Sequence, residues 1–126
     1  MQTDSLEAVE LGGSTQWIRV RGTDAANPVL LLIQQGPGLP MLNEVRRFER
    51  LLGLESHFTV VYWDQRGCGR SLRGADTQSA HPLRHMVADT VSLLEMLTER
   101  FAKKPFVAGF SLGATVAAFA DRKSVV

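Results

Sequence analysis

The sequence has little of what a disulfide framework or a metal centre would require. Cys68 is the single cysteine in 126 residues. One cysteine cannot form an internal disulfide, and it cannot build a thiolate-rich metal site. A free thiol is typical of a reducing compartment. The chain does not begin with a positively charged stretch followed by an apolar stretch. No apolar run approaches the length that spans a bilayer. We therefore expect a cytoplasmic protein.

An excess of charge of either sign is also missing. The formal net charge is +1, and the 14 Lys and Arg residues are scattered along the chain. A nucleic-acid surface or an anionic-membrane surface would need these side chains gathered in a stripe. We expect no nucleic-acid partner and no membrane partner. With 44% hydrophobic residues, a chain of this length builds one core, so it is one domain or part of one.

Strand and helix patterns alternate along the chain. Residues 7–11 and 16–21 flank a turn at Gly12 and Gly13, which predicts an antiparallel hairpin. The remaining elements are apolar strands at 29–33, 58–63 and 106–108, a crossover helix at 41–52, and a helix from Pro82 to about residue 100. This alternation predicts an α/β fold with parallel strands and right-handed crossovers. Ligands of such folds bind at the carboxyl ends of the strands.

A glycine-rich polar segment follows each of the three apolar strands. These segments are residues 34–38 (QQGPG), 64–71 (DQRGCGRS) and 109–113 (GFSLG). Because the carboxyl ends of parallel strands meet at one edge of a sheet, the segments should lie together. A dinucleotide site is the competing interpretation, but no G-x-G-x-x-G follows the first strand, and Pro37 lacks an N–H for a phosphate. We expect neither a cofactor nor a metal ion.

The third segment, Gly109-Phe110-Ser111-Leu112-Gly113, stands between an apolar run and a helix-forming run. This is the strand, turn and helix context of a nucleophile elbow. A serine hydroxyl is a weak nucleophile unless such a turn presents it to a histidine. The motif arises by chance in a chain of this length with a probability of about 0.04, so a Gly/Ser-rich loop that only turns the chain is the alternative.

Taken in order and spacing, the three segments resemble the α/β-hydrolase superfamily, and most of all its proline iminopeptidase-like branch. That branch carries H-G-G-P-G, D-Q-R-G-x-G-x-S and G-x-S-x-G at these places. The resemblance implies that residues 1–120 are the N-terminal half of an α/β-hydrolase core, with Ser111 as the catalytic nucleophile. It also implies an oxyanion hole made by backbone N–H groups of Leu112, Gln35 and Gly36. The residues that shape the site would be Gly109, Gly113, Pro37, Gly38, Asp64, Arg66 and Gly67.

Two features depart from the family pattern. Gln34 and Gln35 stand where the family has His and Gly, which predicts a changed pocket beside the oxyanion loop. In this fold the order is serine, then acid, then histidine, whereas the three histidines all precede Ser111. We interpret these three, His57, His81 and His85, as surface or capping residues. We interpret Asp64 as an anchor of its loop and not as the triad acid.

The implied activity is that of a serine hydrolase that cleaves small esters, amides or short peptides through an acyl-enzyme. The more specific expectation is a peptidase-like aminopeptidase of the proline iminopeptidase type. We expect the chain as given to be inactive, because the triad acid and histidine are missing from it. Two alternatives stay open: a non-catalytic binding protein with the hydrolase fold, and an acyltransferase on the same scaffold, in which an acceptor other than water takes the acyl group.

Residues 121–126 (DRKSVV) interrupt the apolar helix pattern that precedes them. They are one translation of GATCGGAAGAGCGTCGTG, the start of a widely used sequencing adapter. We therefore interpret residues 121–126 as a non-native tail and expect the native sequence to continue differently after residue 120.

Overall fold

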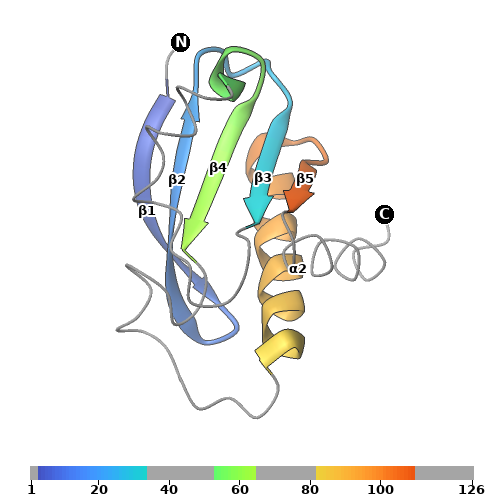
Figure 1. Ribbon diagram of the computed structural model, residues 1–126. Helices are drawn as coiled ribbons and strands as arrows, with labels where there is room; N and C mark the ends of the chain where they lie inside the picture. The colour runs from blue at the N-terminus through green and yellow to red at the C-terminus, as the bar shows by residue number, and fades with distance from the viewer. Residues whose placement is uncertain (1–2, 34–52, 65–81, 110–126) are drawn as a thin grey trace.

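A computed structural model describes residues 3–33, 53–64 and 82–109 of the chain (Figure 1). The helix predicted at 41–52, the segments that follow the first two apolar strands, and the predicted elbow lie outside the described residues, as do residues 121–126.

The described strands form one mixed sheet in the order β1-β2-β4-β3-β5. β1 (Thr3–Leu11) and β2 (Ser14–Gly22) are antiparallel, and β2 also pairs antiparallel with β4 (Thr59–Asp64). β3 (Val29–Ile33) lies between β4 and β5 (Phe106–Gly109) and is parallel to both. The predicted hairpin and parallel strands are thus confirmed (Figure 1).

The hairpin is longer than the apolar pattern predicts. Its strands reach back to Thr3 and forward to Gly22, and Leu11 pairs with Ser14 across the turn. The two central residues of the turn have positive φ, 57° at Gly12 and 77° at Gly13. A two-residue hairpin loop with positive φ at both positions matches the right-handed twist of its strands, and glycine adopts this conformation without strain.

Helix α2 (Pro82–Phe101) covers one face of the sheet. It begins beyond the carboxyl ends of β3 and β4 and runs back antiparallel to them (Figure 1). Its bounds agree with the prediction from Pro82 and the apolar stripe. The buried side chains that it contributes to the core are Met86, Val87, Leu93, Leu94 and Leu97, which pack with Ile18, Val20, Leu31, Val61 and Trp63.

The other face of the sheet carries a second buried cluster, formed by Leu30, Leu32, Val60 and Tyr62. Because β3 and β4 are buried on both faces, they match the prediction of fully covered strands. β5 differs from its neighbours. Phe106 is 60% exposed, and the rest of the strand is half-buried. Within the described residues β5 forms the edge of the sheet, with β3 beside it on one side.

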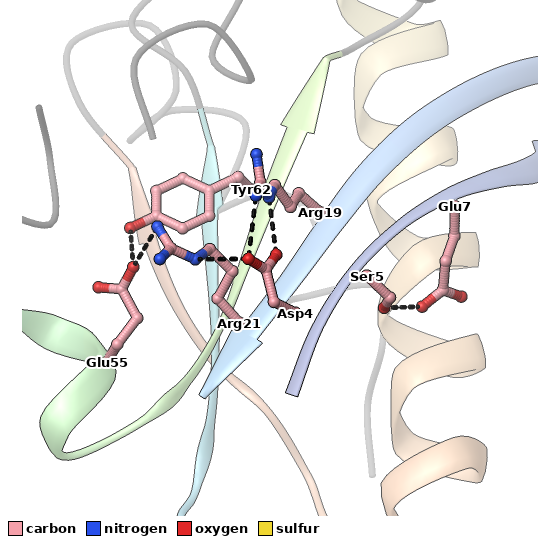
Figure 2. Close-up of polar contacts among 7 residues, drawn as sticks. All are labelled: Asp4, Ser5, Glu7, Arg19, Arg21, Glu55 and Tyr62. Carbon is pink, nitrogen blue, oxygen red and sulfur yellow. Dashed lines mark hydrogen bonds and ion pairs between the residues drawn. The ribbon is translucent and has the colours of Figure 1, made fainter. Parts of the chain in front are cut away.

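A charged chain of contacts crosses this second face near the amino end of β4 (Figure 2). Asp4 receives two hydrogen bonds from Arg19, at 2.8 and 3.0 Å. Arg21 lies 3.7 Å from the Asp4 carboxylate and 3.5 Å from that of Glu55. The Tyr62 hydroxyl donates to Glu55 over 2.9 Å. These contacts connect β1, β2, β4 and the 3₁₀ turn η2 (Leu54–Ser56), which precedes the amino end of β4.

On the hairpin's outer strand, Glu7 is held by two neighbours. Arg100, at the end of α2, donates two hydrogen bonds to its carboxylate, at 2.7 and 2.9 Å, and the Ser5 hydroxyl donates a third at 2.6 Å. The Arg100 hydrogen bonds lower the pKa of Glu7, against a partial desolvation that raises it, and Ser5 and the charge of Arg100 add to the lowering. This contact connects β1 directly to the last turn of α2.

The lowered pKa of Glu7 predicts a pH-dependent contribution to stability. A carboxyl with a depressed folded-state pKa stabilises the fold above its unfolded pKa, and this stabilisation is lost as the pH falls through the folded value. Glu7→Gln should therefore lower the free energy of unfolding at pH 7 by less than about 1 kcal/mol, because the pair is partly solvated. At pH 3 the difference from the parent should shrink toward zero. Urea unfolding at both pH values measures it.

Glu99→Gln is the matched control, since Glu99 is an exposed acid in the same last turn of α2. It removes the same formal charge without touching the Glu7 contact. An equal pH dependence in both variants would show that general charge, and not the Arg100 contact, produces the effect.

Candidate functional site

The candidate site is the edge of the sheet where β3, β4 and β5 end. β3 and β5 end level, because Ile33 pairs with Gly109. Leu31 pairs with Val61 in the parallel β3–β4 register, so Ile33 also lies level with Trp63, one residue before β4 ends. The three glycine-rich segments therefore start from neighbouring points of one edge, as the sequence predicts.

Two of the predicted site residues lie in the described strands. Asp64 is the last residue of β4, and Gly109 is the last residue of β5. The other predicted site residues lie outside the described part of the chain: Ser111, Leu112, Gly113, Gln35, Gly36, Pro37, Gly38, Arg66 and Gly67. For these residues the structure fixes the strand end from which each segment departs and nothing further.

Asp64 is 1% exposed, and its backbone pairs with Trp17 of β2. A buried carboxylate needs polar partners to offset its lost hydration. The role of Asp64 as an anchor of the 64–71 segment stays a prediction.

The two histidines in the described part of the chain lie toward opposite ends of the sheet. His57 is exposed and precedes β4, so it lies at the end opposite the candidate site. Its backbone N–H donates to the Leu54 carbonyl, and the prediction of a surface histidine is confirmed there. His85 is half-buried in the first turn of α2, on the side of the candidate site. His81 lies outside the described residues.

Sequence reasoning missed a buried polar group at this edge. The Gln16 side chain is 0% exposed. Its amide nitrogen donates to Asp89 over 2.9 Å, and its amide oxygen accepts from the Trp63 indole over 3.0 Å. The sequence contained a signal of this contact, because Gln16 lies on the same buried face of β2 as Ile18 and Val20. A glutamine at such a position needs a buried partner.

Neither a metal centre nor a membrane span appears in the part of the chain that the structure describes. There, no cluster of three or more His, Cys, Asp or Glu side chains is suited to hold a metal ion. The described helices also include none with the length and apolar character needed to cross a bilayer.

Comparison with known proteins gives matches of two kinds. The model of the family described as serine aminopeptidase, S33, matches residues 48–123, which is well over half of the chain. A probable aminopeptidase of Bacillus subtilis (strain 168), YbaC, is 34% identical over 113 residues. That alignment covers 89% of this chain and 35% of the relative. The chain thus spans about a third of the length of this relative.

Solved structures agree with the arrangement of the strands. A proline iminopeptidase-related protein of Thermus thermophilus superposes with a TM-score of 0.73 at 27% identity, covering 96% of this chain and 41% of that protein. The 2-hydroxy-6-oxo-6-phenylhexa-2,4-dienoate hydrolase of Rhodococcus sp. strain RHA1 gives a TM-score of 0.74 at 21% identity. It covers 98% of this chain and 43% of that protein, and at this identity it supports the fold alone.

Fold and family therefore agree. The mixed sheet, with an antiparallel hairpin followed by parallel strands, is that of the α/β-hydrolases, and the family match extends over two of the three glycine-rich segments. The chain belongs to the serine aminopeptidase S33 family of α/β-hydrolases.

Proposed function

We propose that a complete protein carrying this chain is a serine hydrolase that cleaves small esters or amides, with Ser111 as its nucleophile. The observation that carries the proposal is the level pairing of Ile33 with Gly109. It brings the start of the 34–38 segment beside the start of the elbow, and a hydrolase needs these two segments to meet there.

The proposed reaction uses both segments. The Ser111 hydroxyl attacks the substrate carbonyl carbon and gives its proton to a histidine, while backbone N–H groups of Leu112, Gln35 and Gly36 stabilise the oxyanion. The C–O or C–N bond of the substrate then breaks, and the leaving alcohol or amine takes the proton from the histidine. Water attacks the acyl-enzyme, releases the carboxylic acid and restores Ser111.

The histidine and its acid partner belong, in this proposal, to the part of a complete hydrolase that follows residue 120. The three histidines of the chain precede Ser111, and His57 lies at the opposite end of the sheet. We therefore propose that the 126-residue chain alone does not turn over substrate.

For the substrate we propose an N-terminal amino-acid amide or a short peptide. The description of the matching family and the name of the Bacillus subtilis relative support an aminopeptidase. Gln34 and Gln35 support a pocket that differs from that of the proline iminopeptidase-like branch, because side chains there replace the imidazole and the glycine of its pattern.

Changing the nucleophile gives the first test of this function. In a complete protein carrying this chain, Ser111→Ala should reduce hydrolysis of p-nitrophenyl acetate and of amino-acid p-nitroanilides by about 10⁴-fold or more, because the acyl-enzyme cannot form. A fluorophosphonate probe should label the parent protein at Ser111, and it should label neither the variant nor the 126-residue chain.

Each contrary outcome has a definite meaning. Unchanged turnover in the Ser111→Ala protein would refute the nucleophile assignment. A complete protein that neither turns over substrate nor reacts with the probe would support a non-catalytic binding protein. Faster transfer to an added amine or alcohol than to water would indicate an acyltransferase.

A second substitution tests the oxyanion loop. Gln35→Gly in the same complete protein removes a side chain but keeps the backbone N–H, so total activity should fall far less than the roughly 10²- to 10³-fold expected when an oxyanion donor is lost. The ratio of kcat/KM values for proline and alanine p-nitroanilides should shift, because space opens beside the loop. Abolished activity would indicate that the Gln35 amide itself acts in the reaction.

A further inference from the structure

The Gln16 amide joins three elements of the fold at one buried point. It connects β2 to Trp63 on β4, 47 residues away, and to Asp89 on α2, 73 residues away. All three residues are at most 2% exposed. Water therefore does not compete for these hydrogen bonds, and each polar atom depends on its protein partner.

The hydrogen-bonding capacities of the three groups fix the orientation of the amide. An indole N–H can only donate, and an ionised carboxylate can only accept. Gln16 meets both with the two ends of one planar group, its oxygen toward Trp63 and its nitrogen toward Asp89. An apolar residue of similar size would satisfy neither partner, and a glutamate would place a second carboxylate against that of Asp89.

The position of this group relates it to the candidate site. Trp63 directly precedes Asp64, where the 64–71 segment begins. Toward the carboxyl end of β4, the last described pair between β2 and β4 is Trp17 with Asp64. Gln16 precedes Trp17 in β2 and so lies one residue further in that direction. Gln16 therefore lies where the hairpin, α2 and the end of β4 come together.

We propose that Gln16 is a positioning residue of the candidate site: its amide holds the Trp63 indole against α2 and thereby fixes the point at which the 64–71 segment leaves β4. The proposal rests on the function proposed above, because that function assigns the segment to the site. The hairpin, which contributes none of the predicted catalytic groups, would then control the geometry of the site.

The chain contains its own reporters for a test. Cys68 is the only cysteine and belongs to the 64–71 segment, so its reaction rate with 5,5′-dithiobis(2-nitrobenzoate) reports on that segment. The sequence has two tryptophans, and in a Trp17→Phe background the indole N–H resonance comes from Trp63 alone. Both measurements are made on the 126-residue chain and require no catalysis.

Gln16→Leu removes both hydrogen bonds at nearly constant volume. We expect it to raise the Cys68 reaction rate roughly five- to tenfold, in line with the net loss of one or two buried hydrogen bonds, and to shift the Trp63 indole resonance. Thr90→Val is the matched control. Thr90 is buried beside Asp89, but its hydroxyl donates only within α2, to the Met86 carbonyl at 2.7 Å. Its Cys68 rate should stay within about twofold of the parent.

An exchange of the two partners tests the hydrogen bond between positions 16 and 89 itself. Gln16→Glu alone should raise the Cys68 rate, because two carboxylates then face each other. Adding Asp89→Asn restores a donor, so the double variant should bring the rate back to within about twofold of the parent. If Gln16→Leu does not fold, this exchange decides the question.

An unchanged Cys68 rate and Trp63 resonance in Gln16→Leu would overturn the proposal, as would an equal effect of Thr90→Val or a double variant without rescue. None of these outcomes depends on hydrolysis. Loss of the proposed function would instead appear as absent Ser111-dependent turnover in a complete protein, with the Gln16 measurements unaffected.

Discussion

The position of β3 between β4 and β5 is the constraint on which the rest of the structure depends. A five-residue strand that is buried along its whole length has no stable place except inside a sheet. Once both neighbours run parallel to it, all three strands end at the same edge. The points at which the predicted oxyanion loop and elbow begin lie side by side because of this pairing.

The hairpin and α2 stabilise this arrangement in different ways at the two ends of the sheet. At the amino end of β4 the contacts are charged. The Asp4–Arg19 pair is partly exposed, and pairs of this kind contribute little, whereas Glu55 and Tyr62 are buried. At the carboxyl end, beside the candidate site, the fully buried Gln16 amide takes their place. Buried hydrogen bonds fix geometry more strictly than exposed ion pairs, because an unpaired buried group is strongly unfavourable. The Gln16 amide is thus a geometrically strict contact beside the candidate site.

Elements with a clear hydrophobic period could be predicted from the sequence. Contacts that depend on the tertiary register of the strands and the helix could not. The hairpin turn, the covered strands and the start of α2 at Pro82 were all visible locally. The first residues of β1 were missed, because Thr3, Asp4 and Ser5 are polar and form a strand only through pairing with β2. The Gln16–Asp89 contact was not predictable, since it joins positions 73 residues apart. Of the site, Asp64 and Gly109 lie at the ends of β4 and β5, the two strands that flank β3, while the serine and the oxyanion donors rest on motif and family.

The strand order also sets the sequence of events when the chain emerges from a ribosome. The hairpin closes through neighbouring residues and can form first. β3 is made before β4, yet β4 must insert between β2 and β3, and β5 must then join the far side of β3. β3 is therefore synthesised before the strands that pair with it. Its apolar side chains stay exposed until those strands follow, which favours aggregation or binding by a chaperone. The same pairing that aligns the three strand ends thus requires β3 to remain unpaired until β4 has been synthesised.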